Sequence, residues 1–197
     1  MNSFAKDFPI VCVGGSAGGA SSYVQLLKHL PPETCVAIVI VNHIKTTPAS
    51  LHKILPRSTK MPVKLIVEGL RIQPNHVFII PTNCDLHVLD GTFRLSPISK
   101  PKGWPDVITV FLRSLAQNWD GKLVAVIVSG LDADGAEALR EIKEAGGITI
   151  AQSPDSAEWS DMPANAIKTG RIDFILSVED IAQKIVQIAN AFPEKAI

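Results

Sequence analysis

The sequence predicts an α/β protein whose doubly wound, mostly parallel sheet carries helices on both faces. Short apolar runs rich in Val and Ile alternate along the chain with segments of helical periodicity. Several of these runs lack a strict alternation of apolar and polar residues, as expected of strands that are covered on both faces. Strands that alternate with helices pair in parallel because each helix carries the chain back to the starting edge of the sheet.

Each predicted strand is a short apolar run bounded by glycine, proline or polar turn residues. These runs are Ile10–Val13, Cys35–Val41, Val63–Ile66, Val77–Ile80, Val124–Ser129, Ile148–Ala151 and Phe174–Leu176. The predicted helices are the segments between and after them: Ser21–His29, Pro48–Leu55, Val107–Gln117, Asp134–Ala145, Pro163–Lys168 and Val178–Ala191. In the last of these, Ile181, Ile185 and Ile188 recur at helical spacing.

The segment 86–95 differs from the rest because it contains two strand-like pieces and no helical pattern. The dipeptide Asp90-Gly91 separates the two pieces. It suits a tight turn with positive φ angles, so we expect one antiparallel β-hairpin here.

Composition limits the possible functions. The 197 residues are 46% hydrophobic and 19% charged, and we expect a single domain over residues 1–197 and a monomer. The formal net charge of zero argues against nucleic-acid binding, which requires clustered Lys and Arg.

We find no signal-peptide pattern and no apolar stretch of bilayer length, so we expect a cytoplasmic protein without membrane insertion. Cys12, Cys35 and Cys84 form no C-x-x-C pair, which favours buried free thiols over a metal site or a disulfide.

The stretch from Val11 to Gly19 carries the clearest chemical signal. An apolar run leads into Gly14-Gly15-Ser16-Ala17-Gly18-Gly19, and a helical pattern follows from about Ala20. A strand-to-helix turn needs backbone angles that glycine adopts at little cost, and it aims the first N–H groups of the helix at one point. Gly14-x-Ser16-x-Gly18 fits the nucleophile-elbow pattern, so Ser16 is a candidate nucleophile with an oxyanion site beside it.

Other interpretations of these glycines fit the spacing less well. A dinucleotide fingerprint that starts at Gly14 would need glycine in place of Ser16, and a P-loop would need Lys in place of Ala20. Two plainer roles stay open from this segment alone. In the first role the turn only binds an anion. In the second role the Ser16 hydroxyl only caps the helix that follows.

The ends of two other predicted strands carry the residues that a nucleophilic serine needs. Ligands of doubly wound sheets bind outside the carboxyl ends of the strands, where His43 and Asp134 stand. Histidine suits a general base near neutral pH, and a carboxylate fixes its tautomer. Taken alone, His43 is most simply a surface histidine and Asp134 a helix N-cap; together with Ser16 they suggest a triad. The chain order Ser, His, Asp differs from that of α/β-hydrolases. The weaker candidates by placement are His29, His52, His76 and His87.

In combination these motifs resemble the catalytic domain of the chemotaxis receptor-glutamate methylesterase, the CheB-type methylesterase domain. The similarity extends from about Pro9 to about Ala191, and the motifs agree in order, spacing and flanking residues. The similar segments are Gly14–Gly19, Asn42-His43, Pro74–Pro81, Ser129–Ala136, Leu139–Gln152 and Met162–Gly170.

The resemblance implies hydrolysis of glutamyl γ-methyl esters on the cytoplasmic helices of methyl-accepting chemotaxis receptors, with no metal or organic cofactor. Many members of the family also deamidate receptor glutamines. By this resemblance Ser16 is the nucleophile, His43 the base and Asp134 the acid. The residues expected to form the elbow turn and the oxyanion site are Gly15, Ala17, Gly18 and Leu131.

The chain departs from the family pattern at several points. Ala17 stands where threonine is common, Leu131-Asp132 replaces Met-Gly, and the region around Trp104 lacks an Arg-Pro-Ser run. Asp132 adds a carboxylate close to Asp134, and like charges disfavour ionisation. We expect Asp132, Trp104 and Met162 to contact substrate or to modulate the site. No receiver domain precedes the first predicted strand, so we expect no control by phosphorylation within this chain.

Two alternatives stand beside the methylesterase. One is a catalytically weak paralogue that binds a receptor-like helix or a regulator, which Asp132 and the altered region around Trp104 favour. The other is a hydrolase of the same mechanism that acts on small esters. The complete set Ser16, His43 and Asp134 argues against the weak paralogue.

Overall fold

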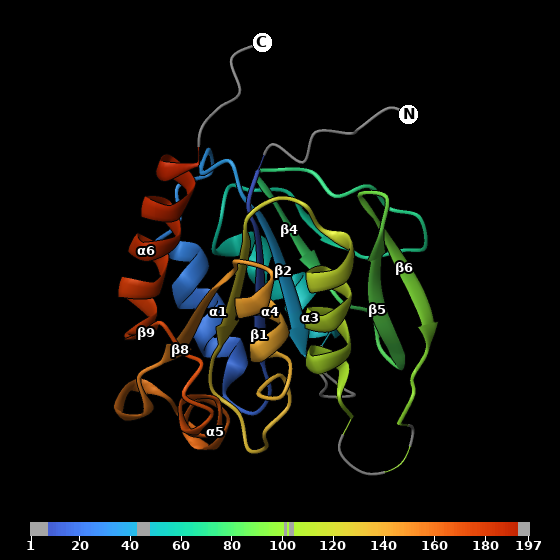
Figure 1. Ribbon diagram of the computed structural model, residues 1–197. Helices are drawn as coiled ribbons and strands as arrows, with labels where there is room; N and C mark the ends of the chain where they lie inside the picture. Colours follow the sequence, from blue (N-terminus) through green and yellow to red (C-terminus); the bar gives the residue numbers. More distant parts are fainter. Residues whose placement is uncertain (1–7, 43–47, 101, 103–104, 193–197) are drawn as a thin grey trace.

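The computed structural model describes residues 8–42, 48–100, 102 and 105–192, and at its centre lies one parallel sheet (Figure 1). In these residues the strand order is β3-β4-β2-β1-β7-β8-β9, and every neighbouring pair is parallel. The strands are β1 (Ile10–Gly15), β2 (Ala37–Asn42), β3 (Val63–Leu65), β4 (His76–Ile79), β7 (Leu123–Ile127), β8 (Ile148–Gln152) and β9 (Phe174–Leu176). The predicted doubly wound α/β fold is confirmed, with small shifts at the strand ends.

Helices cover both faces of the sheet (Figure 1). They are α1 (Gly19–Lys28), α2 (Pro48–Ile54), α3 (Val107–Asn118), α4 (Leu139–Glu144), α5 (Asp161–Lys168) and α6 (Val178–Ala191), with the short turns η1 (Leu55–Arg57) and η2 (Pro154–Ser156). One core takes apolar side chains from α3, α4 and α5, and the other from α1, α2 and α6. Because successive strand residues face opposite sides, Cys12 lies in the first core and Val11 and Val13 in the second. None of the helices in the described ranges is both long and apolar enough to span a bilayer.

The predicted hairpin forms a separate antiparallel pair that packs on α3 (Figure 1). Its strands are β5 (Cys84–Leu89) and β6 (Thr92–Pro97). They are joined at Asp90 and Gly91, whose φ angles are 50° and 72°, as the dipeptide predicts. The hairpin is fixed to α3 in part by the Val88 N–H, which donates to the Ser114 hydroxyl (2.9 Å).

The order of the strands reverses at β1. The chain first extends the sheet from β1 towards β2, β4 and β3, and then returns to add β7, β8 and β9 on the other side. Such a reversal leaves a crevice beyond the carboxyl ends of the two central strands, where doubly wound proteins bind ligands. Ser16 follows β1 and Asp134 follows β7, so both candidate residues lie at this switch point.

Two predictions of local structure are wrong. The helix predicted over Asp134–Ala145 begins only at Leu139, because Gly135 takes a φ of 88° and residues 134–138 form turns. Cys35, predicted as a buried strand residue, is exposed, since it has a φ of 58° and precedes the first residue of β2. Cys12 is buried and free as predicted.

Candidate active site

Ser16 occupies the turn between β1 and α1. Its N–H donates to the Ser129 carbonyl oxygen (2.9 Å), and its own carbonyl oxygen accepts from the Gly19 N–H (3.0 Å). Gly18 stands at the N-cap of α1 with a φ of 71°, a left-handed conformation that favours glycine. Ser16 is only 4% exposed, so the turn holds a nearly buried serine whose backbone is fixed on both sides.

Gly15 is required by close packing rather than by its backbone angles, and Gly19 packs tightly against the same side chain. A Cβ atom on Gly15 would lie 2.5 Å from the Tyr23 hydroxyl oxygen and 2.8 Å from a methyl carbon of Val128. A Cβ atom on Gly19 would lie 3.0 Å from the same hydroxyl oxygen. Burial raises the pKa of Tyr23 above its usual range, so the phenol stays neutral. The Tyr23 phenol therefore packs against the turn and fixes how α1 leaves β1.

We expect Gly15→Ala to lower the free energy of unfolding by about 1–3 kcal/mol, the usual cost of forcing an extra methyl group into a filled core. The methyl group would overlap the Tyr23 hydroxyl, so either the ring or the strand must move. Denaturant unfolding measures the loss. The double variant Gly15→Ala/Tyr23→Phe lacks the hydroxyl and should recover part of it. Equal stability of Gly15→Ala and the unchanged chain would contradict this account of the turn.

Ser129, two residues after the end of β7, connects the β1–α1 turn to the loop that precedes α5. Its buried hydroxyl donates to the Ala17 carbonyl oxygen (2.8 Å) and accepts from the Trp159 N–H (2.9 Å). The side chain of Gln152, at the end of β8, accepts from the Ser129 N–H (3.1 Å) and from the Ser22 hydroxyl (3.0 Å). The turn is thus supported from β7, β8 and α1 together. Sequence reasoning missed this network, whose only local signal is a polar residue at the end of each of two apolar runs.

The residues that follow β7 lie against Ser16. Gly130 donates its N–H to the Trp159 carbonyl oxygen (3.0 Å) and accepts from the Met162 N–H (3.0 Å). A Cβ atom on Gly130 would lie 3.0 Å from the Ser16 Cβ and would overlap the Met162 sulfur. Met162, predicted to contact substrate or to modulate the site, is buried. By contrast, Leu131 is 40% exposed and Trp159, which sequence reasoning did not single out, is 45% exposed.

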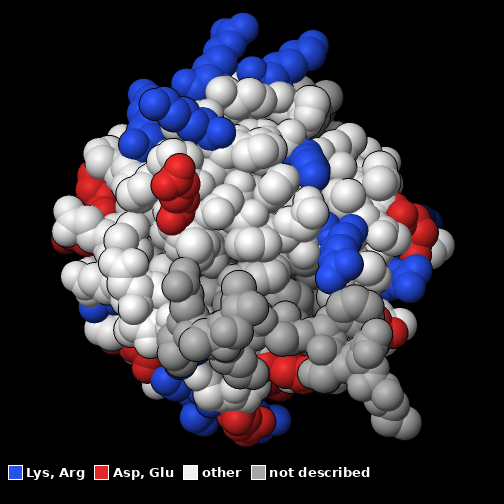
Figure 2. All heavy atoms as spheres, turned by 90° about the horizontal axis from the view of Figure 1, so that it is seen from above, with Lys and Arg blue, Asp and Glu red and all other residues white. Residues whose placement is uncertain are grey.

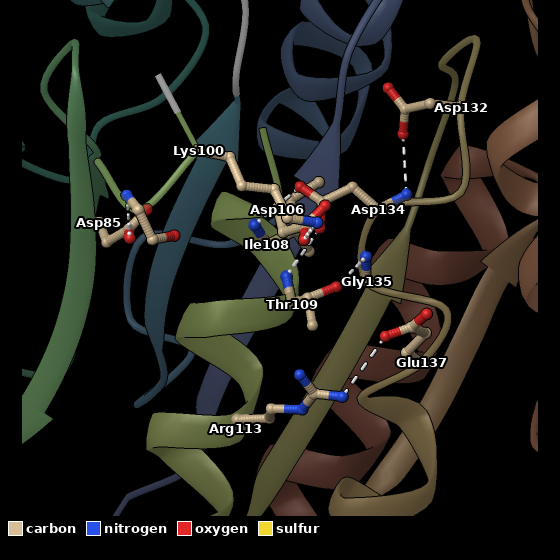
Figure 3. Close-up of polar contacts among 11 residues, drawn as sticks. Asp85, Lys100, Asp106, Ile108, Thr109, Arg113, Asp132, Asp134, Gly135 and Glu137 are labelled. Carbon is tan, nitrogen blue, oxygen red and sulfur yellow. Dashed lines mark hydrogen bonds and ion pairs between the residues drawn. The ribbon is translucent and has the colours of Figure 1, made fainter. Parts of the chain in front are cut away.

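Asp134 is buried at the N-terminus of α3 (Figure 3). Its two carboxylate oxygens accept from the N–H groups of Ile108 and Thr109, each at 2.9 Å, and the Thr109 hydroxyl accepts from the Gly135 N–H (2.8 Å). Asp106, at the N-cap position, makes no capping hydrogen bond and pairs with Lys100 instead. Asp134 therefore caps α3 and not the helix that follows it in the chain.

The side chain of Ile108 connects the region of Asp134 to the strand that precedes the β1–α1 turn. A Cβ atom on Gly14 would lie 2.7 Å from the Ile108 Cγ2 atom, and a Cβ atom on Gly135 would lie 2.8 Å from it. The Ile108 side chain thus packs between the strand that leads to Ser16 and the residue after Asp134. Burial raises the pKa of the Cys12 thiol above its usual range, and the charge of Asp134 adds to this effect.

A cavity of about 320 Å³ opens beside Asp134, between the start of α3 and residues 132–137. Asp132 lines it and accepts from the Asp134 N–H through Oδ1 (2.8 Å), so it fixes the backbone of the capping residue (Figure 3). Lys100 lies at the same cavity. Its hydrogen bond to Asp106 raises the pKa of Lys100 above the usual range, and the charges of Glu137 and Asp134 add to the effect. Of the described residues that line the cavity, Lys100 is therefore the one cation beside the carboxylates of Asp106, Asp132, Asp134 and Glu137.

Two predicted site residues, His43 and Trp104, lie outside the described residues. Asn42, which precedes His43, ends β2 opposite Gly15 in the register of β1 and β2. Across the described ranges, no three His, Cys, Asp or Glu side chains lie close enough together to hold a metal ion.

Known proteins are similar to this chain in both sequence and fold. The model of the CheB methylesterase family matches residues 11–185. The putative protein-glutamate methylesterase/protein-glutamine glutaminase of Leptospira interrogans strain Fiocruz L1-130 is 31% identical over 184 residues, which cover 92% of this chain and 95% of that protein. Protein-glutamate methylesterase/protein-glutamine glutaminase 3 of Pseudomonas aeruginosa is 32% identical over 181 residues, which cover 91% of this chain and 54% of that protein.

The crystal structure of the Thermotoga maritima CheB methylesterase catalytic domain matches with a TM-score of 0.84 and 28% identity, and covers 92% of this chain and 98% of that domain. The chain thus spans nearly the whole Leptospira relative and about half of the Pseudomonas one. The family model covers most of the chain, and the fold agrees with it. The chain belongs to the CheB methylesterase family, a family of hydrolases.

Proposed function

We propose that the chain hydrolyses glutamyl γ-methyl esters on the helices of methyl-accepting chemotaxis receptors. Ser16 is the nucleophile, His43 the general base, and Asp134 the acid that orients His43. One observation carries the proposal: Ser16 and Asp134 follow the neighbouring strands β1 and β7, and the Ile108 side chain packs between Gly14, two residues before Ser16, and Gly135, the residue after Asp134. The family and the names of the relatives support the substrate class.

In the proposed reaction the Ser16 Oγ attacks the ester carbonyl carbon while His43 takes the hydroxyl proton. The tetrahedral intermediate collapses, the bond to the methoxy oxygen breaks, and His43 returns the proton so that methanol leaves. Water that is deprotonated by His43 then attacks the acyl-enzyme. When this second intermediate collapses, the bond to Ser16 Oγ breaks, His43 gives the water proton to that oxygen, and the glutamate is released. The same route on a glutamine side chain would release ammonia, which is the glutaminase reaction in the names of the relatives.

The oxyanion of each intermediate needs hydrogen-bond donors placed in advance. We assign this role to the backbone N–H groups of Ala17 and Gly18 in the turn and of Leu131 after Gly130. The N-terminus of α1 follows Gly18 directly, and its dipole favours negative charge there. The role of Gly15 is steric, because it belongs to β1 and lies against Tyr23.

Mass spectrometry of a receptor fragment that carries methylated glutamates tests the proposal. We expect the unchanged chain to remove the methyl groups, and Ser16→Ala to leave them in place. Binding of the fragment without loss of methyl groups would support the weak paralogue. Turnover of a nitrophenyl acetate alone would support the small-ester hydrolase. The same spectra report whether receptor glutamines become glutamates.

We expect Trp159→Ala to weaken receptor binding. The exposed Trp159 and Leu131 flank the elbow and offer apolar surface on which a receptor helix can pack. Loss of the indole should raise KM for the methylated fragment roughly tenfold, or about 1.4 kcal/mol, and leave kcat for a small ester unchanged. Ile175→Ala is the matched control, since Ile175 is 50% exposed but lies on β9 at the sheet edge. An equal rise in KM for both variants would rule out a specific role for Trp159.

A further inference from the structure

An open groove of about 550 Å³ lies on the side of the molecule away from the elbow. It is formed by residues 27–32, at the end of α1, and residues 57–60, at the end of η1. Because α1 and α2 start beyond the carboxyl ends of β1 and β2 and run back, both segments lie where the strands begin. A molecule in this groove would leave the carboxyl edge of the sheet open.

The groove is positively charged. Lys28, Arg57 and Lys60 line it, and all three are exposed, whereas no Asp or Glu is among its lining residues. Within the described part of the chain, none of the three cations forms an ion pair with a carboxylate. Figure 2 looks onto the edge where the strands begin and shows Lys and Arg gathered along one side of it. In a chain with a formal net charge of zero, this is a local excess of positive charge.

We propose that this basic groove docks an acidic segment of a partner protein. Cations that share a concave surface reinforce one another and attract a partner of opposite charge. The C-terminus of α1 carries partial negative charge, so recognition depends on the three side chains and not on the helix end. The groove is open and mostly polar, which suits an extended peptide.

Two features favour a peptide over a nucleic acid. Among the described residues, the groove has no Phe, Tyr or Trp side chain on which a base could stack, and its one aromatic ring is the small imidazole of His29. Three cations on a chain of zero net charge also give little of the counterion release that holds a phosphate backbone. Since the groove lies away from Ser16, a docked partner would hold the protein near its substrate and raise the effective concentration without blocking the elbow.

Fluorescence anisotropy with a fluorescein-labelled poly-glutamate peptide tests the proposal directly. We expect binding at low salt that weakens at about 0.15 M salt, where surface charges are screened. The triple variant Lys28→Gln/Arg57→Gln/Lys60→Gln should bind at least about tenfold more weakly, since it loses three charge-assisted contacts. The matched control Lys102→Gln/Lys168→Gln/Arg171→Gln removes the same charges from exposed positions outside the groove and should bind like the unchanged chain.

Peptide binding at low salt that is equal in both triple variants, or absent from the unchanged chain, would overturn the proposal. Displacement of the peptide by a lower concentration of a single-stranded oligonucleotide would assign the groove to nucleic acid instead. Circular dichroism checks that the variants are folded, and the single variants Lys28→Gln and Lys60→Gln replace the triple variant if it is not. The measurement needs no esterase activity, so its outcome is independent of the role of Ser16.

Discussion

Ser16→Ala abolishes hydrolysis of methylated receptor glutamates if the elbow serine is the nucleophile. Loss of the nucleophile in a serine triad lowers kcat by about 10⁶, and we expect a loss of that order here. The fold should persist, because alanine keeps the Cβ that lies against Gly130, and the two hydrogen bonds that fix the turn come from the backbone. Mass spectrometry of the receptor fragment measures turnover, and thermal unfolding measures stability.

Ser21→Ala is the control for that variant. Ser21 is an exposed serine in the first turn of α1, close in sequence to Ser16 but outside the turn itself. It should hydrolyse the ester at the normal rate. If Ser16→Ala retained near-normal turnover, the assignment of the nucleophile would be wrong.

Asp134→Asn should lower kcat by up to about 10⁴, as the same change does in serine proteases by leaving the histidine in the wrong tautomer. Asp134 is the carboxylate that α3 holds in place, through the N–H groups of Ile108 and Thr109. An asparagine can accept only one of these hydrogen bonds well, so a stability loss of about 1–3 kcal/mol is also expected. Rates must therefore be compared well below the melting temperature of the variant.

Asp132→Asn is the matched change two residues away. The asparagine side-chain oxygen can still accept from the Asp134 N–H, so the loop should keep its shape. We expect nearly normal turnover, and a gain is consistent with the loss of a like charge beside Asp134. If Asp132→Asn lost turnover while Asp134→Asn kept a normal rate, the orienting acid would be Asp132 and not Asp134.

Local patterns were enough to predict most of the fold. The run that ends in Gly14-Gly15 gives β1, and Asp90-Gly91 gives the hairpin turn, because each depends on the preferences of neighbouring residues. The same kind of reasoning failed at Asp134. Its position before Gly135 indicated a cap for the next helix, whereas its carboxylate reaches α3, about 25 positions earlier in the chain.

Local sequence patterns also could not predict where the Met162 side chain lies. The sequence shows that it belongs to a family motif, but only packing reveals that it is buried against Gly130, while Trp159 presents exposed surface nearby. Whether a side chain points into the core or to solvent depends on which elements meet there. The approach of His43 to Ser16 stays a prediction.

The sequence by itself determined the α/β class, the hairpin, the elbow around Ser16 and the family, since all of these are patterns of adjacent or regularly spaced residues. Only the tertiary structure decided that Asp134 caps α3, that Ser129 and Gln152 support the turn, and that Lys28 and Arg57 share a groove. These are contacts between residues far apart in the chain. They form only when the sheet brings strand ends and helix ends together, so no local preference encodes them.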